Sequence, residues 1–215
     1  VWCRMALEHD TRKTTLLNID AHINGANIWK LKVGQFLGAD DFLDAKYVLY
    51  TADEKQFITA RVMGVHALSE FSEGKSYPFQ VGMIPHAIEF FEHEDAYRDA
   101  TGDTETIPGV LFPYGMYSNL MVSAIEEDGA PARSEILLTR ALLHIESCEH
   151  RQMELEGRRF GGFYHLIAAT QFGPLDIASA TGCEPGSFAL ITGCMSAKVL
   201  LQSRIEEEQK EQSHD

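Results

Sequence analysis

Residues 101–129, TGDTETIPGVLFPYGMYSNLMVSAIEEDG, are the stretch on which the expected fold depends. They begin with a polar turn, continue through an entry loop with two prolines, and end in an apolar run closed by a glycine. Residues 117–125 are apolar around most of a helical circumference. A short helix without a polar face belongs in the interior of a fold. We therefore predict a buried central helix at 117–125.

Strand-like runs lie on both sides of this segment. An Asn-Gly pair at 24–25 is a strong hairpin signal, and the turn ADEK at 52–55 joins two runs rich in β-branched and aromatic residues. Residues 134–150 fit either a strand or a helix, and the strand is favoured because a second strand-like run follows. The expected strands therefore lie within 16–33, 47–51, 56–68, 134–150 and 161–173.

Two further helices are expected outside this sheet. Pro85 is placed to open a helix that Gly102 would end, and residues 187–212 carry apolar side chains at helical spacing before a charged end. The sequence thus predicts an α+β fold, in which a curved antiparallel sheet wraps a central apolar helix and a long C-terminal helix packs outside. We expect one domain over 1–215, with 1–15 and 206–215 loosely ordered, and we find no internal repeat at a fixed period.

Composition restricts the partners. The 215 residues include 18 Lys and Arg against 32 Asp and Glu, a formal charge of −14. Such a charge repels phosphates and anionic lipids, so we expect no nucleic-acid partner. No apolar run approaches the roughly 20 residues that span a bilayer, so no membrane insertion is expected. The four cysteines form no CxxC pair and predict reduced thiols in a cytoplasmic protein, with a Cys183–Cys194 disulfide as the alternative.

A family resemblance begins at the same stretch. ATGDT (100–104) and IPGVL with MYSNLMV (107–122) resemble the core of hot-dog-fold acyl-thioester dehydratases and hydratases of the MaoC-like and FabZ-like group. The upstream GKSYPFQVGMIPHAIEFF (74–91) is also similar to that family, so about 50 residues carry the resemblance. It implies a sheet wrapped around the helix and a lyase acting on an acyl thioester. The family's catalytic histidine has no counterpart between Asp103 and Pro108.

The resemblance also implies an active site. Asp103 and Glu105 would form a carboxylate pair for general acid–base work, with His93 as a reserve base. Helix N-terminal amides near a glycine could polarise the thioester carbonyl. No cofactor is implied. The substrate-binding residues would be Gly109, Phe112, Tyr114, Gly115 and Tyr117.

Two histidine clusters offer a different chemistry. On a helix, His86, Glu89 and His93 would share one face, and these side chains are suitable ligands for a divalent metal. A second cluster is formed by His144, Cys148 and His150, which align if that segment is a strand. Neither cluster has a standard metal-site spacing, so surface histidines are the expected interpretation and no metal is predicted.

Two functions remain open at this point. The first is binding or acid–base transformation of a small acyl substrate by a homo-oligomeric enzyme. The alternative is a non-catalytic structural or assembly subunit, since apolar strands and a charged C-terminal segment suit a protein that buries surface against copies or partners.

Overall fold

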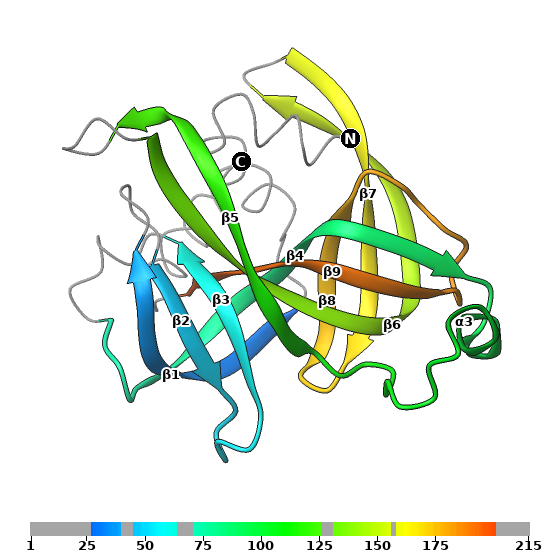
Figure 1. The fold of residues 1–215 in the computed structure, drawn as a ribbon, viewed down its shortest axis with the longest axis horizontal. Coiled ribbons are helices and arrows are strands. Elements are labelled where there is room, and N and C mark those ends of the chain that lie inside the picture. Colours follow the sequence, from blue (N-terminus) through cyan, green and yellow to red (C-terminus); the bar gives the residue numbers. More distant parts are fainter. Residues whose placement is uncertain (1–26, 40–44, 64–70, 126–130, 156–157, 201–215) are drawn as a thin grey trace, which may run out of the picture.

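A computed structural model describes residues 27–39, 45–63, 71–125, 131–155 and 158–200 (Figure 1). These residues form a mixed sheet with one short helix, α3. Among them, no helix is long and apolar enough to cross a lipid bilayer. The strands are β1 (Ile28–Ala39), β2 (Ala45–Tyr50), β3 (Phe57–Met63), β4 (Ser76–Phe91), β5 (Phe112–Ile125), β6 (Pro131–Leu155), β7 (Arg158–Thr170), β8 (Gly173–Ser179) and β9 (Phe188–Val199), and α3 spans Glu94–Thr101.

The sheet closes on itself twice. One ring runs β1-β2-β3-β9-β4 and returns to β1, and the other runs β6-β7-β8-β4-β9 and returns to β6. The long antiparallel β4–β9 ladder belongs to both rings and crosses the middle of the molecule in Figure 1. We call them the N-terminal ring and the C-terminal ring. Neither is complete without a strand from the other half of the chain.

Both rings have the same strand order. In the N-terminal ring, β1 to β3 are the first three strands, β4 is the fourth and β9 is the fifth. With this numbering the order around the ring is 1-2-3-5-4-1. The third and fifth strands run parallel. In the C-terminal ring β9 is fourth and β4 fifth, and β8 again runs parallel to the fifth strand. This is the strand order of the five-stranded OB-fold. The chain is therefore a structural duplication in which the last strand of each half, β4 or β9, belongs to both rings.

The register supports this duplication. In the β1–β4 ladder Leu31 lies opposite Tyr77, and in the β6–β9 ladder Leu143 lies opposite Ala189, each 112 positions further along the chain. Trp29 and Phe79 likewise correspond to Ala141 and Ile191. The inward-facing residues of β3 and β8 are buried at matching positions, namely Ile58, Ala60 and Val62 against Leu175, Ile177 and Ser179. Side-chain identities differ, which is why no repeat is visible in the sequence.

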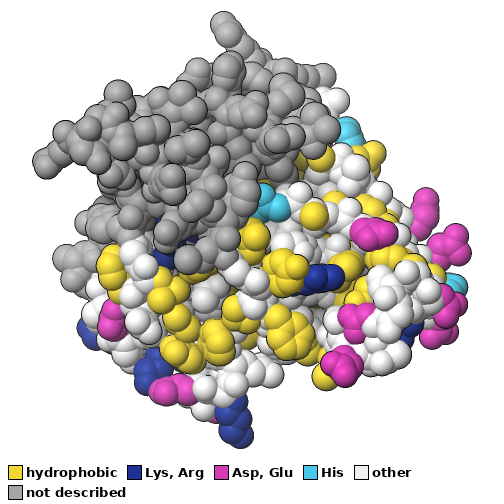
Figure 2. Space-filling model, viewed as in Figure 1, with side chains coloured by type: hydrophobic (Ala, Val, Ile, Leu, Met, Phe, Trp, Pro, Cys, Tyr) yellow, Lys and Arg dark blue, Asp and Glu magenta, His cyan; other side chains and the backbone are white. Residues whose placement is uncertain are grey.

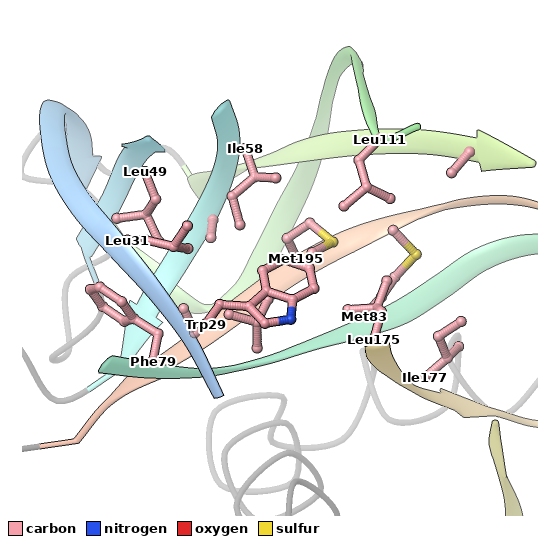
Figure 3. Packing of buried hydrophobic residues seen from close by; sticks show 14 of the residues in the cluster. Trp29, Leu31, Leu49, Ile58, Phe79, Met83, Leu111, Leu175, Ile177 and Met195 are labelled. Atoms are coloured by element: carbon pink, nitrogen blue, oxygen red, sulfur yellow. The ribbon is translucent and has the colours of Figure 1, made fainter. Parts of the chain in front are cut away.

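One apolar core runs through both rings. Figure 3 shows Leu31, Leu49 and Phe79 packed in the N-terminal ring, and Met83 close to Leu175 and Ile177 of β8. These side chains are almost fully buried. Helix α3 covers a separate patch on the C-terminal ring, where Tyr97 packs with Phe91 and Leu142. Strand β6 is consequently buried on both faces, since Leu142 and Leu143 point in opposite directions and both are inaccessible.

The predicted fold class is wrong. Residues 117–125 belong to strand β5, which pairs with β6 instead of forming a central helix. Residues 188–199 form strand β9, which pairs with β3, β4 and β6. A segment of about ten apolar residues fits both the helical and the strand periodicity, so the sequence pattern does not distinguish them. Here backbone hydrogen-bond partners from distant parts of the chain favour the strand. The hot-dog architecture and the long C-terminal helix are therefore both absent from the described residues.

The remaining expectations about elements are partly confirmed. Strands β2, β3, β6 and β7 occupy the predicted runs, and Gly102 ends α3 with a left-handed φ of 69°. Pro85 lies inside strand β4 and does not open a helix. The Asn24–Gly25 turn, residues 1–15 and residues 206–215 lie outside the described residues.

Candidate functional site

Asp103, the predicted acid–base residue, holds a loop together. Its Oδ2 accepts hydrogen bonds from the Tyr97 hydroxyl and the Thr106 hydroxyl, each at 2.5 Å. Its Oδ1 accepts the backbone N–H groups of Glu105 and Thr106 at 2.9 and 3.0 Å. The Thr106 and Tyr97 hydroxyls, together with these amides, lower the pKa of the Asp103 carboxyl well below its usual range. At neutral pH this group is a saturated hydrogen-bond acceptor.

Arg98 completes the same loop. Its guanidinium donates to the carbonyl oxygens of Asp103 and Thr106 and to the Glu94 carboxylate. Glu105, the second predicted carboxylate, is exposed. His93 caps the N-terminus of α3, where its Nδ1 accepts the Ala96 N–H at 3.0 Å. These contacts explain the polar 101–106 turn as the structure that holds the loop after α3 against the helix.

The predicted substrate-binding residues whose side chains the structure describes do not enclose a tunnel. Gly109 exchanges backbone hydrogen bonds with Leu142 and Gln171. Phe112 and Tyr114 lie on the outside, with 46% and 56% of their surfaces exposed. Gly115 has a φ of 151° at a register shift between β5 and β6. The side chain of Tyr117 lies outside the part of the chain that the structure describes.

The two histidine clusters are dispersed. His86 and Glu89 lie on strand β4 whereas His93 caps a helix. In the second cluster His144 contacts the Phe188 ring and His150 contacts the Tyr164 ring. Within the described ranges, no three His, Cys, Asp or Glu side chains converge as metal ligands.

His86 instead lies beside a cysteine. Its Nε2 is 3.1 Å from the Sγ of Cys194 on the neighbouring strand β9. A β-bulge between Pro85 and Ala87 places His86 there, and Gly193 opposite allows the backbones to approach closely. Burial lowers the pKa of the His86 imidazole, because desolvation disfavours its charged form.

The cysteines are free thiols at the three described positions, Cys148, Cys183 and Cys194. The alternative Cys183–Cys194 disulfide is therefore not formed. Cys183 lies beside Cys148 instead, and burial together with that neighbour raises its pKa to about 11. A thiol with so high a pKa is protonated and unreactive at neutral pH.

A buried polar pair on the C-terminal ring was not predicted. His165 Nε2 lies 2.7 Å from Asp176 Oδ1, and both side chains are buried. The second carboxylate oxygen accepts a hydrogen bond from the Asn27 side chain at 3.0 Å. This network joins the start of β1 to the C-terminal ring, so it is a structural contact between the two halves.

The outer face of the N-terminal ring carries an aromatic platform. In one row across the sheet, Lys32 lies opposite Tyr50, which lies opposite Phe57. The Tyr50 and Phe57 ring centroids are 5.9 Å apart. The Tyr50 ring also covers Gly34, where a Cβ would lie 2.2 Å from a ring carbon. Phe57 keeps 41% of its surface exposed. We call Tyr50 and Phe57, with the adjacent lysines, the β2–β3 platform.

Lysines border this platform. Lys30 and Lys32 project from β1 on the outer face, since Leu31 and Val33 between and after them are buried. Lys32 forms an ion pair with Glu54. Lys30 is exposed and has no carboxylate partner among the described residues. The alternation in IWKLKV and the turn between Tyr50 and Phe57 were visible in the sequence and could have indicated this site.

Negative charge is unevenly distributed along the chain. Residues 27–80 carry six Lys and Arg (30, 32, 46, 55, 61, 75) against seven Asp and Glu (40, 41, 44, 53, 54, 70, 73), whereas residues 86–106 carry one Arg (98) against seven acids (89, 92, 94, 95, 99, 103, 105). Figure 2 shows most of the visible acidic side chains around α3 and most of the visible basic ones, with a few acidic ones, near β2 and β3. The negative charge is therefore concentrated around α3, while residues 27–80 are close to neutral.

Comparison with known proteins adds no family. No family model, no curated protein and no solved structure matches this chain. The relation to the OB-fold therefore rests on strand order and register alone.

Proposed function

We propose that this chain is a single-stranded nucleic-acid-binding module that uses the outer face of β1, β2 and β3. The observation that carries this proposal is the Tyr50–Phe57 pair on the outer face, in which Phe57 is exposed and Tyr50 half-buried, bordered by lysines. Proteins that bind single strands combine aromatic rings, on which bases stack, with cations that follow the phosphates. Lys32, Tyr50 and Phe57 occur here in one row of one sheet face, and Lys30 lies two residues from Lys32 on the same face.

Strand order adds support by analogy. OB-folds bind oligonucleotides on the face of their second and third strands, which in the N-terminal ring are β2 and β3. A fold alone does not imply a function, so the argument depends on the residues at this position. The corresponding row of the C-terminal ring holds His144, Ala169 and Pro174, which offer no such aromatic pair.

The net charge of −14 is unevenly distributed, which bears on the expectation that a polyanion is repelled. Residues 27–80 carry six Lys and Arg against seven Asp and Glu, so phosphates approaching the N-terminal ring meet a nearly neutral segment in which Lys30 and Lys32 border the platform. The acidic surface around α3 would repel the rest of a polyanion and so restrict it to one end. We therefore replace the expectation of no nucleic-acid partner with this proposal.

The test is binding of a labelled oligo-dT of about 15 nucleotides, within the range of about 4–16 nucleotides covered by one OB-fold. Phe57→Ala should weaken binding about 5- to 150-fold, equivalent to about 1–3 kcal/mol for one stacked base. Lys30→Gln should reduce the slope of log K against log salt by about 0.7. Glu92→Gln near α3 removes one charge from the acidic end and should leave Kd unchanged.

A wild-type chain that binds neither DNA nor RNA single strands at low salt would show the proposal to be wrong. Equal affinity for duplex and single-stranded DNA would also contradict it, because paired bases cannot stack on the platform.

A further inference from the structure

A second exposed aromatic surface lies at the start of β5. Phe112 and Tyr114 point outward there, and Arg140 of β6 lies opposite Phe112 in the ladder. The Arg140 guanidinium carbon is 5.1 Å from the centroid of the Tyr114 ring, within the range of a cation–π contact. Ile107, just before the strand, is also exposed.

This surface has the chemistry of the β2–β3 platform. Arg140 contacts no carboxylate among the residues that the structure describes, so its charge is available to an anion. An arginine held against an exposed tyrosine presents a flat cation and a flat ring together. Both groups stack on nucleobases, and the guanidinium also binds phosphate.

The strands that carry the two surfaces meet. Strands β3 and β5 contact each other although they belong to different ladders. Figure 2 shows hydrophobic side chains across the face in view, from the region of β2 and β3 to the start of β5. A single strand that is bound near β3 and crosses this face reaches the start of β5.

We infer that Tyr114 and Arg140 form a second stacking site for the same single strand, which extends the binding path from the N-terminal ring onto the β5–β6 ladder. This inference rests on the proposed function. Its consequence is a dependence on length, because a short oligonucleotide occupies only the β2–β3 platform and a long one engages both sites. Binding of a long strand at one site then raises its effective concentration at the other site, which increases the overall affinity.

The experiment compares oligo-dT of about 8 nucleotides, within the range of about 4–16 that one OB-fold covers, with oligo-dT of about 30 nucleotides, which exceeds it. Two charge variants are matched, since Lys30→Gln and Arg140→Gln each remove one cation. Two aromatic variants are matched in the same way, Phe57→Ala and Tyr114→Ala. We expect Lys30→Gln and Phe57→Ala to weaken binding of both lengths. Arg140→Gln and Tyr114→Ala should weaken only the long one, by about 5-fold or more.

The outcomes separate the two proposals. If the wild type binds neither oligonucleotide, the proposed function is wrong and the second site is wrong with it. If the wild type binds both, and Tyr114→Ala changes neither affinity or both equally, only the second site is wrong. If Tyr114→Ala instead alters the sedimentation coefficient of the free protein without changing binding, the surface is a protein interface and the inference is overturned.

Discussion

Met83 of β4 lies directly opposite Met195 of β9, and this pair marks the centre about which the two halves of the chain are related. The two residues are 112 positions apart, the same shift that relates Leu31 to Leu143 and Tyr77 to Ala189. A pseudo-twofold relation therefore exchanges β4 with β9. Each ring needs one strand from the opposite half, so the rings cannot unfold independently.

This shared ladder predicts one unfolding transition. Leu31→Ala in the N-terminal ring and Leu143→Ala in the C-terminal ring should each destabilise the protein by about 2–5 kcal/mol, because each leaves a cavity at a buried site. Denaturant unfolding followed by tryptophan fluorescence and by circular dichroism should show one coincident midpoint for each variant. Glu89→Ala, on an exposed site of β4, should change stability by less than about 0.5 kcal/mol. Two separate transitions would contradict the sharing of β4 and β9 between the rings.

The Asp103 loop predicts a pH-dependent stability. The folded pKa of this carboxyl lies below the ordinary value of about 3.9. Its contribution is therefore complete above about pH 4 and is lost as the pH falls through the folded pKa. Asp103→Asn should lower Tm at pH 7, and the difference from wild type should shrink toward pH 2.

Asp99→Asn on the exposed side of α3 is the matched control, and its Tm should follow that of wild type at both pH values. A constant difference between Asp103→Asn and wild type over this range would show that the carboxylate charge does not contribute.

The β-bulge at His86 depends on Gly193. A Cβ at this position would lie 2.5 Å from the Ile84 carbonyl oxygen and 3.0 Å from the Pro85 Cα, so the backbones must separate. Gly193→Ala should destabilise the protein by about 1–3 kcal/mol and move His86 away from Cys194. Thermal unfolding measures the first effect, and the rate of Cys194 alkylation measures the second.

Thr192→Ala, on the adjacent residue of β9, keeps the close approach and should have a smaller effect on both measurements. If Gly193→Ala changed the unfolding temperature and the alkylation rate no more than Thr192→Ala does, the bulge would not require a glycine.

Local patterns in the sequence identify several elements correctly. Strands β2 and β3 follow from their β-branched and aromatic residues around the ADEK turn, and the end of α3 follows from Gly102, which adopts the left-handed conformation that favours glycine. These features depend on residues close together in the chain. The concentration of acidic residues at 86–106 can also be read from the sequence, since 27–80 carries nearly equal numbers of basic and acidic residues.

The site was predictable only in part. Phe112 and Tyr114 were identified as binding residues, but for an enclosed tunnel, whereas both are exposed. The alternation of Lys30 and Lys32 was visible, but their position beside Tyr50 and Phe57 depends on ladder register. Asp103 carried the family resemblance, and its hydrogen bonds to Tyr97 and Thr106 are those of a loop.

The sequence by itself therefore determined the local turns, the first strands, the cap of α3 and the distribution of charge. Tertiary structure decided that residues 112–125 and 188–199 are strands and that β4 and β9 are shared between two rings. The physical reason is the location of hydrogen-bond partners. A helix satisfies its backbone within four residues, whereas β9 obtains its partners from β3, β4 and β6, up to about 135 positions away in the chain.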